Sequence, residues 1–256
     1  MQCDGNALLR HLFRVPHMGK IVNAIKVLWL FSWAAIMTLL LFIPMTTAAL
    51  LSRTGNLAFT ISRQWARVIL LVTGTRVRIT GREKIATESR YVIISNHQSQ
   101  FDILALVTSL RMQFRWVIKK ELLRVPLFGW ALYAARNVFI DRSDHEKALA
   151  SIHKGVDRLP EGVSVLVFAE GTRSADGQLG RFKKGGFMIS VEKGLPVLPV
   201  AVKGSRKVLP KGSAVFHPGH IDVVVCDPIE VTGHTHESIE TLIEKIHGVI
   251  DKELRS

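Results

Sequence analysis

The sequence predicts a mixed α/β domain with a largely buried sheet flanked by helices, preceded by an N-terminal helical hairpin embedded in a membrane. Two observations predict this architecture. Residues 27–52 carry no charged side chain, and beyond residue 76 short apolar runs alternate with helical segments. The run 163–168 is dominated by Val, Leu and Phe, which is typical of a strand covered on both faces. We therefore divide the chain into a membrane-anchoring region, residues 1–73, and an α/β domain, residues 74–256.

The apolar N-terminal segment predicts a membrane-embedded helix. Val27 to Ile43 would extend about 26 Å as a helix, which barely matches the apolar thickness of a bilayer, and we expect Pro44 to interrupt it. Basic residues flank residues 27–52 on both sides, so the positive-inside rule does not favour a single crossing. A hairpin embedded from the cytoplasmic side fits better, although the sequence leaves open whether the segment crosses or dips. A cleaved signal peptide is disfavoured because the apolar run lies far from Met1.

The second helix of the hairpin is predicted after Gly55. Its polar residues recur at helical spacing and define one stripe: Asn56, Thr60, Arg63, Gln64 and Arg67. A basic stripe on an otherwise apolar helix suits the membrane interface, where arginines meet lipid phosphates. The alternative is a core helix of the soluble domain.

The elements of the α/β domain follow from alternation, apolar runs and turn residues. Strands are predicted at residues 77–80, 91–94, 114–118, 137–140, 163–168, 195–200 and 221–225. Helices are predicted at residues 103–110, at 119–123 as a short turn, after residue 130, at 144–159 with Ser143 or Asp144 as its cap, and after Gly185.

His97 lies where a strand gives way to a helix, a place where α/β proteins hold reactive groups. A carboxylate five residues on, Asp102, can fold back to hold the imidazole in one tautomer while the other nitrogen takes a proton. A second pair of the same spacing, His217 and Asp222, encloses Pro-Gly and ends in an alternating strand, so we interpret Asp222 as a solvent-facing strand residue. A covalent mechanism through Ser99 is disfavoured because its side chain should diverge from His97.

A second cluster follows the strand 163–168. Gly171 allows backbone amides to approach a ligand, Thr172 offers a hydroxyl, and Arg173 presents a planar fork that matches phosphate oxygens. Glu170 is either part of this site or the ion-pair partner of Arg173. Basic residues then open another helix: Arg181, Lys183 and Lys184. The cluster predicts a phosphate site at the carboxyl end of a strand.

Two further strand ends carry charge. Arg142 is either a second phosphate contact positioned by Asp141 or part of a helix cap. Lys119 and Lys120 begin a helix directly after a strand, so they are candidates for an oxyanion or donor contact. A solvated charge cluster is the more probable interpretation of the two lysines.

Charge and cysteine content restrict the partners. The net charge of +13 in 256 residues implies an anionic partner, which composition alone leaves as nucleic acid, membrane or acidic carrier. Cys3 and Cys226 lie far apart, so neither a disulfide framework nor a metal site is expected. No basic-aromatic interleaving typical of nucleic-acid binding is present, and we expect no nucleic acid partner.

Four segments together resemble the ordered motifs of the glycerolipid acyltransferases, specifically the lysophosphatidic acid acyltransferases. They are Asn-His-Gln-Ser-Gln-Phe-Asp at 96–102, which resembles the His-x4-Asp motif, Phe-Ile-Asp-Arg at 139–142, Phe-Ala-Glu-Gly-Thr-Arg-Ser at 168–174 and Leu-Pro-Val-Leu-Pro-Val at 195–200. The chain departs from the family pattern at Arg136, where the second motif usually begins with Gly, and at Ala169, where the third usually has Pro.

The resemblance implies transfer of an acyl chain from a thioester to the sn-2 hydroxyl of lysophosphatidic acid, giving phosphatidic acid for phospholipid synthesis. His97 would be the general base, Asp102 would orient it, and no acyl-enzyme would form. Glu170, Gly171, Thr172 and Arg173, with Arg142, would hold the glycerol phosphate. The acyl donor would be acyl-CoA or acyl carrier protein, with no further cofactor, and the catalytic domain would lie on the cytoplasmic face of the membrane.

Other interpretations stay open at this point. The acceptor could be glycerol-3-phosphate or another lysophospholipid, since pocket shape decides this and the sequence does not show it. A non-catalytic protein that binds anionic membranes would use the same basic surface and hairpin. An exported hydrolase is disfavoured by the flanking charges. Acyl-chain length, donor preference and oligomeric state are not determined by the sequence.

Overall fold

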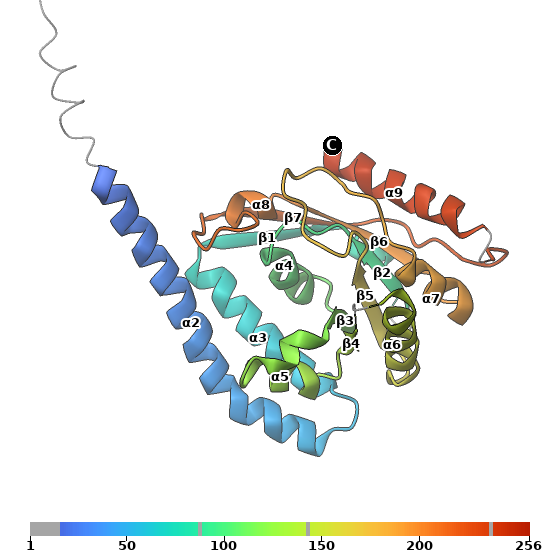
Figure 1. The fold of residues 1–256 in the computed structure, drawn as a ribbon, viewed down its shortest axis with the longest axis horizontal. Coiled ribbons are helices and arrows are strands. Elements are labelled where there is room, and N and C mark those ends of the chain that lie inside the picture. The colour runs from blue at the N-terminus through green and yellow to red at the C-terminus, as the bar shows by residue number, and fades with distance from the viewer. Residues whose placement is uncertain (1–15, 87–88, 142–143, 236–237) are drawn as a thin grey trace, which may run out of the picture.

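A computed structural model describes residues 16–86, 89–141, 144–235 and 238–256. Its centre is a seven-stranded sheet in the order β1-β7-β6-β2-β5-β3-β4 (Figure 1). The strands are β1 Thr75–Thr80, β2 Val92–Ser95, β3 Phe114–Lys119, β4 Val138–Ile140, β5 Ser164–Phe168, β6 Val197–Lys203 and β7 Gly219–Val225. The β6–β7 pair is antiparallel and the other neighbouring pairs are parallel. The predicted mixed sheet is confirmed.

Helices cover both faces of the sheet. They are α2 Pro16–Leu51, α3 Asn56–Val72, α4 Phe101–Ser109, α5 Phe128–Ala134, α6 His145–Asp157, α7 Gly185–Lys193, α8 Ser205–Val208 and α9 Ile239–Arg255, with short 3-10 turns η1 Arg82–Lys84 and η2 Lys120–Arg124. Alternate residues of β2 supply the two cores, because successive side chains of a strand point to opposite faces. Ile93 joins the core under α3 and α4, whereas Val92 and Ile94 join the core under α6, α7 and α9. The prediction of a sheet buried on both faces is therefore confirmed.

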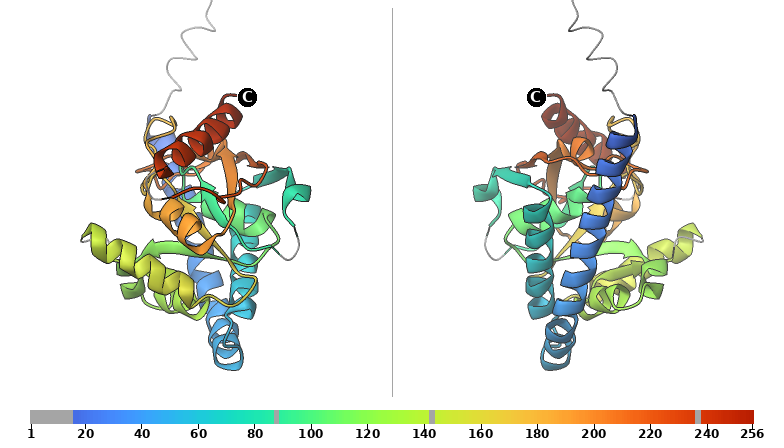
Figure 2. Two further views of the ribbon diagram at one scale, coloured as in Figure 1. Left: turned by 90° about the vertical axis from the view of Figure 1, so that its right-hand side faces the viewer. Right: turned by 90° about the vertical axis from the view of Figure 1, so that its left-hand side faces the viewer.

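The N-terminal region forms two antiparallel helices joined at Gly55 (Figures 1 and 2). The Trp29 indole donates to the Val72 carbonyl, and the Trp65 indole donates to the Thr38 hydroxyl, so the start of α2 lies beside the end of α3. The α2 helix continues through Pro44, contrary to the expected interruption. A proline inside an apolar helix is tolerated where neighbouring groups compensate for its missing N–H.

By length and composition, residues 19–51 of α2 could cross a membrane, and the apolar window of this helix is only 6% buried. Its large side chains are exposed along most of its length, for example Leu28 and Ile43. At about 1.5 Å per residue the 36-residue helix is about 54 Å long. The helix packs on α3 and α5 along one side and presents an exposed apolar surface on the other.

The α3 helix instead packs into the domain. Phe59 and Ile69 are fully buried in the core beneath it. The Arg63 guanidinium donates to the carbonyls of Val107 and Met112 at the end of α4, so the expectation that its charge meets lipid phosphates is wrong. The division of the chain at residue 73 stays a prediction, and α3 contributes to the core on the domain side of that boundary.

A buried arginine fastens the α2–α3 turn to the sheet. Arg115 on β3 has no solvent exposure, and it donates to the Thr54 carbonyl at 3.0 Å and to the Asn56 amide oxygen at 2.6 Å. Its guanidinium also lies 5.1 Å from the centre of the Phe59 ring. Burial lowers the pKa of Arg115 to about 10. The turn between the helices is thus held by a charge in the domain interior.

Candidate functional site

The parallel strands β2, β5 and β3 end at the same edge of the sheet, and a cleft of about 1330 Å³ lies there. It is lined by His97 after β2, by Gly171, Thr172 and Arg173 after β5, and by Lys119 at the end of β3. Because the carboxyl ends of parallel strands meet at one edge, residues far apart in the sequence converge there. The structure therefore brings together His97 and the loop 170–173, here called the arginine loop, which the sequence predicted as two separate features.

His97 and Asp102 are in contact. The Nδ1 atom of His97 lies 2.8 Å from Oδ2 of Asp102, which has no solvent exposure. The same oxygen accepts the backbone N–H groups of Gln98 at 2.7 Å and Ser99 at 2.8 Å. The two backbone N–H groups can only donate, so Oδ2 of Asp102 is the acceptor in these contacts. The carboxylate of Asp102 thus binds the backbone of the turn between β2 and α4, and it holds the imidazole of His97 in one orientation.

The contact with Asp102 assigns the roles of the two ring nitrogens. Because Oδ2 already accepts two backbone N–H groups, we assign it as the acceptor from His97 as well, so that Nδ1 carries the proton and Nε2 holds the free lone pair. The imidazole is stacked on the ring of Phe168, with centroids 3.8 Å apart and an interplanar angle of 9°. Its side chain is only 13% exposed. The ring is therefore fixed in orientation from two sides, and one nitrogen remains available to the cleft.

Two buried side chains connect this turn to neighbouring strands. Asn96 makes both of its amide contacts with the backbone of Val202 on β6, donating to its carbonyl and accepting its N–H. Glu170 accepts the N–H of His97 through Oε1 at 2.9 Å and the N–H of Gly180 through Oε2 at 3.0 Å. Burial raises the pKa of Glu170 above its ordinary value, and the two amides offset part of this rise. Both residues order the backbone around His97.

Ser99 has no free hydroxyl for nucleophilic attack. Its Oγ donates to the Leu209 carbonyl at 2.7 Å and accepts the Phe101 N–H. The residue is fully buried. The second His-x4-Asp pair is also distinct in place, because Asp222 lies on β7, between β1 and β6 and away from the strands β2, β5 and β3 that border the cleft.

The loop after β5 is shaped by Gly171. Its φ of 70° is in the left-handed region that favours glycine, and a Cβ there would lie 2.9 Å from the Lys183 side chain. Lys183 can therefore lie directly against this loop, and its N–H donates to the Ala169 carbonyl. The arginine loop and the start of α7 form one basic wall of the cleft, which also includes Arg181 and Lys184. Lys184 is paired with Glu240.

The remaining predicted residues fall in different places. Lys119 lines the cleft, whereas Lys120 forms an ion pair with Asp141 and does not line it. Glu170 lies beneath the cleft, with both oxygens committed to backbone N–H groups. Arg142 lies outside the described residues, as does Ser143. Asp144 caps α6 by accepting the N–H of Lys147.

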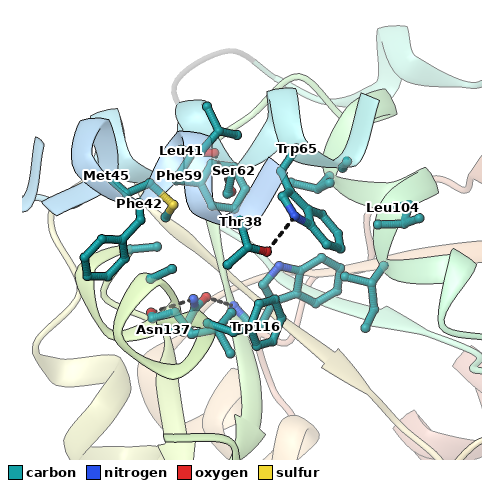
Figure 3. Close-up of a pocket in the computed structure, with 17 residues that line it drawn as sticks. Thr38, Leu41, Phe42, Met45, Phe59, Ser62, Trp65, Leu104, Trp116 and Asn137 are labelled. Carbon is teal, nitrogen blue, oxygen red and sulfur yellow. Dashed lines mark hydrogen bonds between the residues drawn. The ribbon is translucent and has the colours of Figure 1, made fainter. Parts of the chain in front are cut away.

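An apolar pocket of about 100 Å³ lies beside the cleft, between α2, α3 and α5 (Figure 3). Phe42, Met45 and Trp65 approach it from the hairpin, and Trp116 comes from β3. Ile103 and Trp116 line both the pocket and the cleft. Sequence reasoning missed this pocket, because it forms only where the hairpin meets the domain. It also missed Phe168 as the stacking partner of His97, although its place at the end of a strand was a signal.

A sheet whose carboxyl edge presents an oriented imidazole, a basic wall and an apolar recess defines the protein as an α/β group-transfer enzyme. Residues 76–203 match the sequence profile of the acyltransferase family, and the chain belongs to this family.

Known proteins similar to this chain agree with that assignment. It is 35% identical over 195 residues to the 1-acyl-sn-glycerol-3-phosphate acyltransferase of Pseudomonas aeruginosa, covering 74% of this chain and 75% of that protein. It is 34% identical to a chloroplastic 1-acyl-sn-glycerol-3-phosphate acyltransferase of Arabidopsis thaliana over 66% of this chain, and it spans only 48% of that relative's length. The crystal structure of the LPA acyltransferase PlsC from Thermotoga maritima superposes with a TM-score of 0.79 at 26% identity, covering 91% and 95% of the two chains.

Proposed function

We propose that this protein transfers an acyl chain from a soluble thioester to the sn-2 hydroxyl of lysophosphatidic acid. The single observation that carries the proposal is the His97–Asp102 contact in a cleft that Arg173 also lines. The names of the similar proteins support the choice of lysophosphatidic acid over other acceptors. Glycerol-3-phosphate remains the competing acceptor.

In the proposed reaction Nε2 of His97 removes the proton from the acceptor hydroxyl as its oxygen attacks the thioester carbonyl carbon. The C–S bond then breaks, and the thiolate leaves with a proton returned by the imidazolium. Asp102 stabilises the imidazolium and holds its Nδ1–H. The buried hydroxyl of Ser99 supports direct transfer without an acyl-enzyme, because it is already committed to Leu209.

Substrate binding is assigned by charge and apolarity. Arg173, with Gly171 and Thr172, would hold the glycerol phosphate, since a guanidinium matches phosphate oxygens. Glu170 is assigned a positioning role instead, because a carboxylate repels phosphate and its oxygens are committed to backbone N–H groups. The apolar pocket bordered by Ile103 and Trp116 would take the apolar part of a substrate.

The membrane belongs to the same proposal. The exposed apolar length of α2 supports attachment to a lipid bilayer, where both acceptor and product reside. Acyl-CoA and acyl carrier protein are soluble anions of the cytoplasm, so we place the catalytic domain on the cytoplasmic face. The net charge of +13 favours encounter with either donor.

One assay tests the proposal. Purified full-length protein is incubated with labelled lysophosphatidic acid or glycerol-3-phosphate and with either acyl-CoA or acyl carrier protein, and the product is identified by mass. Phosphatidic acid is expected. If glycerol-3-phosphate is acylated in preference, it is the acceptor in place of lysophosphatidic acid. If no combination of acceptor and donor gives an acylated product, the proposal is overturned.

A further inference from the structure

Exposed hydrophobic side chains are concentrated in one segment of the α/β domain. Among the described residues after α3, the large hydrophobic side chains that are exposed all fall between residues 122 and 133. They are Leu122, Val125, Trp130 and Tyr133, and the two aromatic residues are 64% and 61% exposed. Exposed apolar side chains gathered in one place mark an interaction surface. The segment is η2–α5, residues 120–134.

This surface continues that of α2. The ring of Trp130 lies 6.3 Å from the ring of Phe42 on α2, and the neighbouring α2 residues Leu39 and Ile43 are exposed. Figure 1 shows α5 beside the lower half of α2. The two elements therefore present one apolar surface to a single partner.

The η2–α5 segment is also held firmly against the hairpin. Gly55, at the turn between α2 and α3, adopts a φ of 71°, and a Cβ there would lie 3.0 Å from the backbone of Ala135. Asn137 then joins the end of α5 to β3, since its amide donates to the Leu132 carbonyl and accepts the Trp116 N–H. A partner that binds α2 thus meets the exposed aromatic residues at a fixed position.

The chemistry of the surface fits an anionic phospholipid leaflet. Trp and Tyr combine an apolar ring with a polar tip, which suits the boundary between headgroups and acyl chains. Exposed cations lie within or next to this segment in the sequence: Lys119, Arg124, Arg136, and Lys120, which is paired with Asp141. The exposed acid within this segment is Glu121. Such a surplus of positive charge attracts anionic lipid headgroups.

We propose that η2–α5 is a second membrane-contacting element beside α2, which inserts Trp130 and Tyr133 at headgroup level in the same anionic leaflet that binds α2. The inference rests on the membrane attachment in the proposed function. Leu122 belongs both to this surface and to the lining of the catalytic cleft. The element therefore brings the mouth of the cleft to the lipid surface, where a lysophospholipid can enter.

Fluorescence quenching tests the insertion of Trp130 directly. Full-length wild type and Trp130→Phe are mixed with phosphatidylcholine–phosphatidylglycerol vesicles whose acyl chains carry bromine, a contact quencher of indole. We expect the wild type to lose more emission than the variant, since the variant lacks the indole at the surface. Quenching of the other four tryptophans without any difference between the two proteins would overturn this proposal and leave membrane attachment intact. No quenching in either protein would overturn the attachment as well.

Binding to the same vesicles without bromine gives a second test. Trp130→Glu is compared with Thr241→Glu, which adds the same charge at an exposed position of α9. We expect the partition coefficient to fall at least tenfold for Trp130→Glu and less than twofold for Thr241→Glu. Equal binding of the two variants, with unchanged thermal melting, would overturn the proposal.

Discussion

The carboxyl edge of the sheet and the outer surface of α2 differ in which side chains they bury and which they expose. At the edge, polar groups are buried and paired, as the three hydrogen bonds to Oδ2 of Asp102 illustrate. On α2, large apolar side chains are exposed, and the helix has few contacts beyond α3 and α5. The difference teaches that the proposed reaction chemistry and the proposed membrane attachment reside in largely separate sets of residues, which α3 connects. Each set can therefore be changed alone.

The largest expected effect separates chemistry from attachment. His97→Ala removes the proposed base, and we expect turnover to fall by about 10³-fold, within the range that a positioned general base contributes. Vesicle binding should not change, because the His97 side chain is only 13% exposed and contributes little to the surface. His217→Ala is the matched control and should keep full activity. Turnover above a tenth of the wild-type value would move the chemistry to another group.

The next effect compares the two helices of the hairpin. Phe59 of α3 is 1% exposed and packs edge-on against Phe114, so Phe59→Ala should lower the free energy of unfolding by about 3 to 5 kcal/mol. Ile43 of α2 is 71% exposed. Ile43→Ala should therefore change the free energy of unfolding by less than about 0.5 kcal/mol. Urea unfolding in detergent measures both. Equal losses would show that α2 is part of the folded core.

Arg173→Ala should act on the acceptor without affecting attachment. Truncating one side of a desolvated charge pair costs about 2 to 4 kcal/mol, which we expect as a raised KM for lysophosphatidic acid. Arg158→Ala removes a cation from an exposed position after α6 and serves as the control. An unchanged KM and kcat in the Arg173 variant would exclude its guanidinium from the phosphate site.

The smallest effect concerns Glu170. Since burial raises the pKa of Glu170, the folded protein holds this proton more tightly than the unfolded chain does. Stability from this group is present at low pH, and it declines as pH rises from the ordinary glutamate pKa of about 4.3 through the raised folded pKa. The melting temperature of wild type relative to Glu170→Gln should therefore fall across that window.

Exposed Glu161, replaced by Gln, is the control for the pH series and should run parallel to the wild type. A wild-type advantage over Glu170→Gln that grows with pH would contradict the assignment. It would mean that the two N–H groups on Glu170 outweigh the cost of burying its charge.

The sequence predicted most of the fold because the strands of the sheet are short, apolar and separated by turns. The spacing of His97 and Asp102 also placed them at a strand end, where the structure holds them 2.8 Å apart. Their catalytic roles stay predictions. The α9 helix was missed, although Leu242, Ile243, Ile246 and Ile250 have the spacing of an amphipathic helix.

What the sequence could not show depends on contacts between distant segments. The polar residues of α3 have the same spacing whether they face lipid or protein. Arg63 faces protein because the carbonyls at the end of α4 accept hydrogen bonds from its guanidinium. The partners of Glu170 are likewise backbone N–H groups, which no residue pattern reveals. From the sequence, Glu170 was predicted as a charged residue of the phosphate site. Its contacts with backbone N–H groups instead order the chain around His97.

The guanidinium of Arg115 has a consequence for the order of folding. Its partners Thr54 and Asn56 belong to the helix turn, whereas Arg115 itself belongs to β3. A chain with the turn undocked would leave the buried guanidinium with Gln113 and Phe114 as acceptors but without Thr54 and Asn56, and removing the partners of a buried charge is strongly destabilising. We therefore expect docking of the N-terminal helices and closure of the sheet to be one cooperative event, so that the proposed lipid-binding and catalytic parts form together.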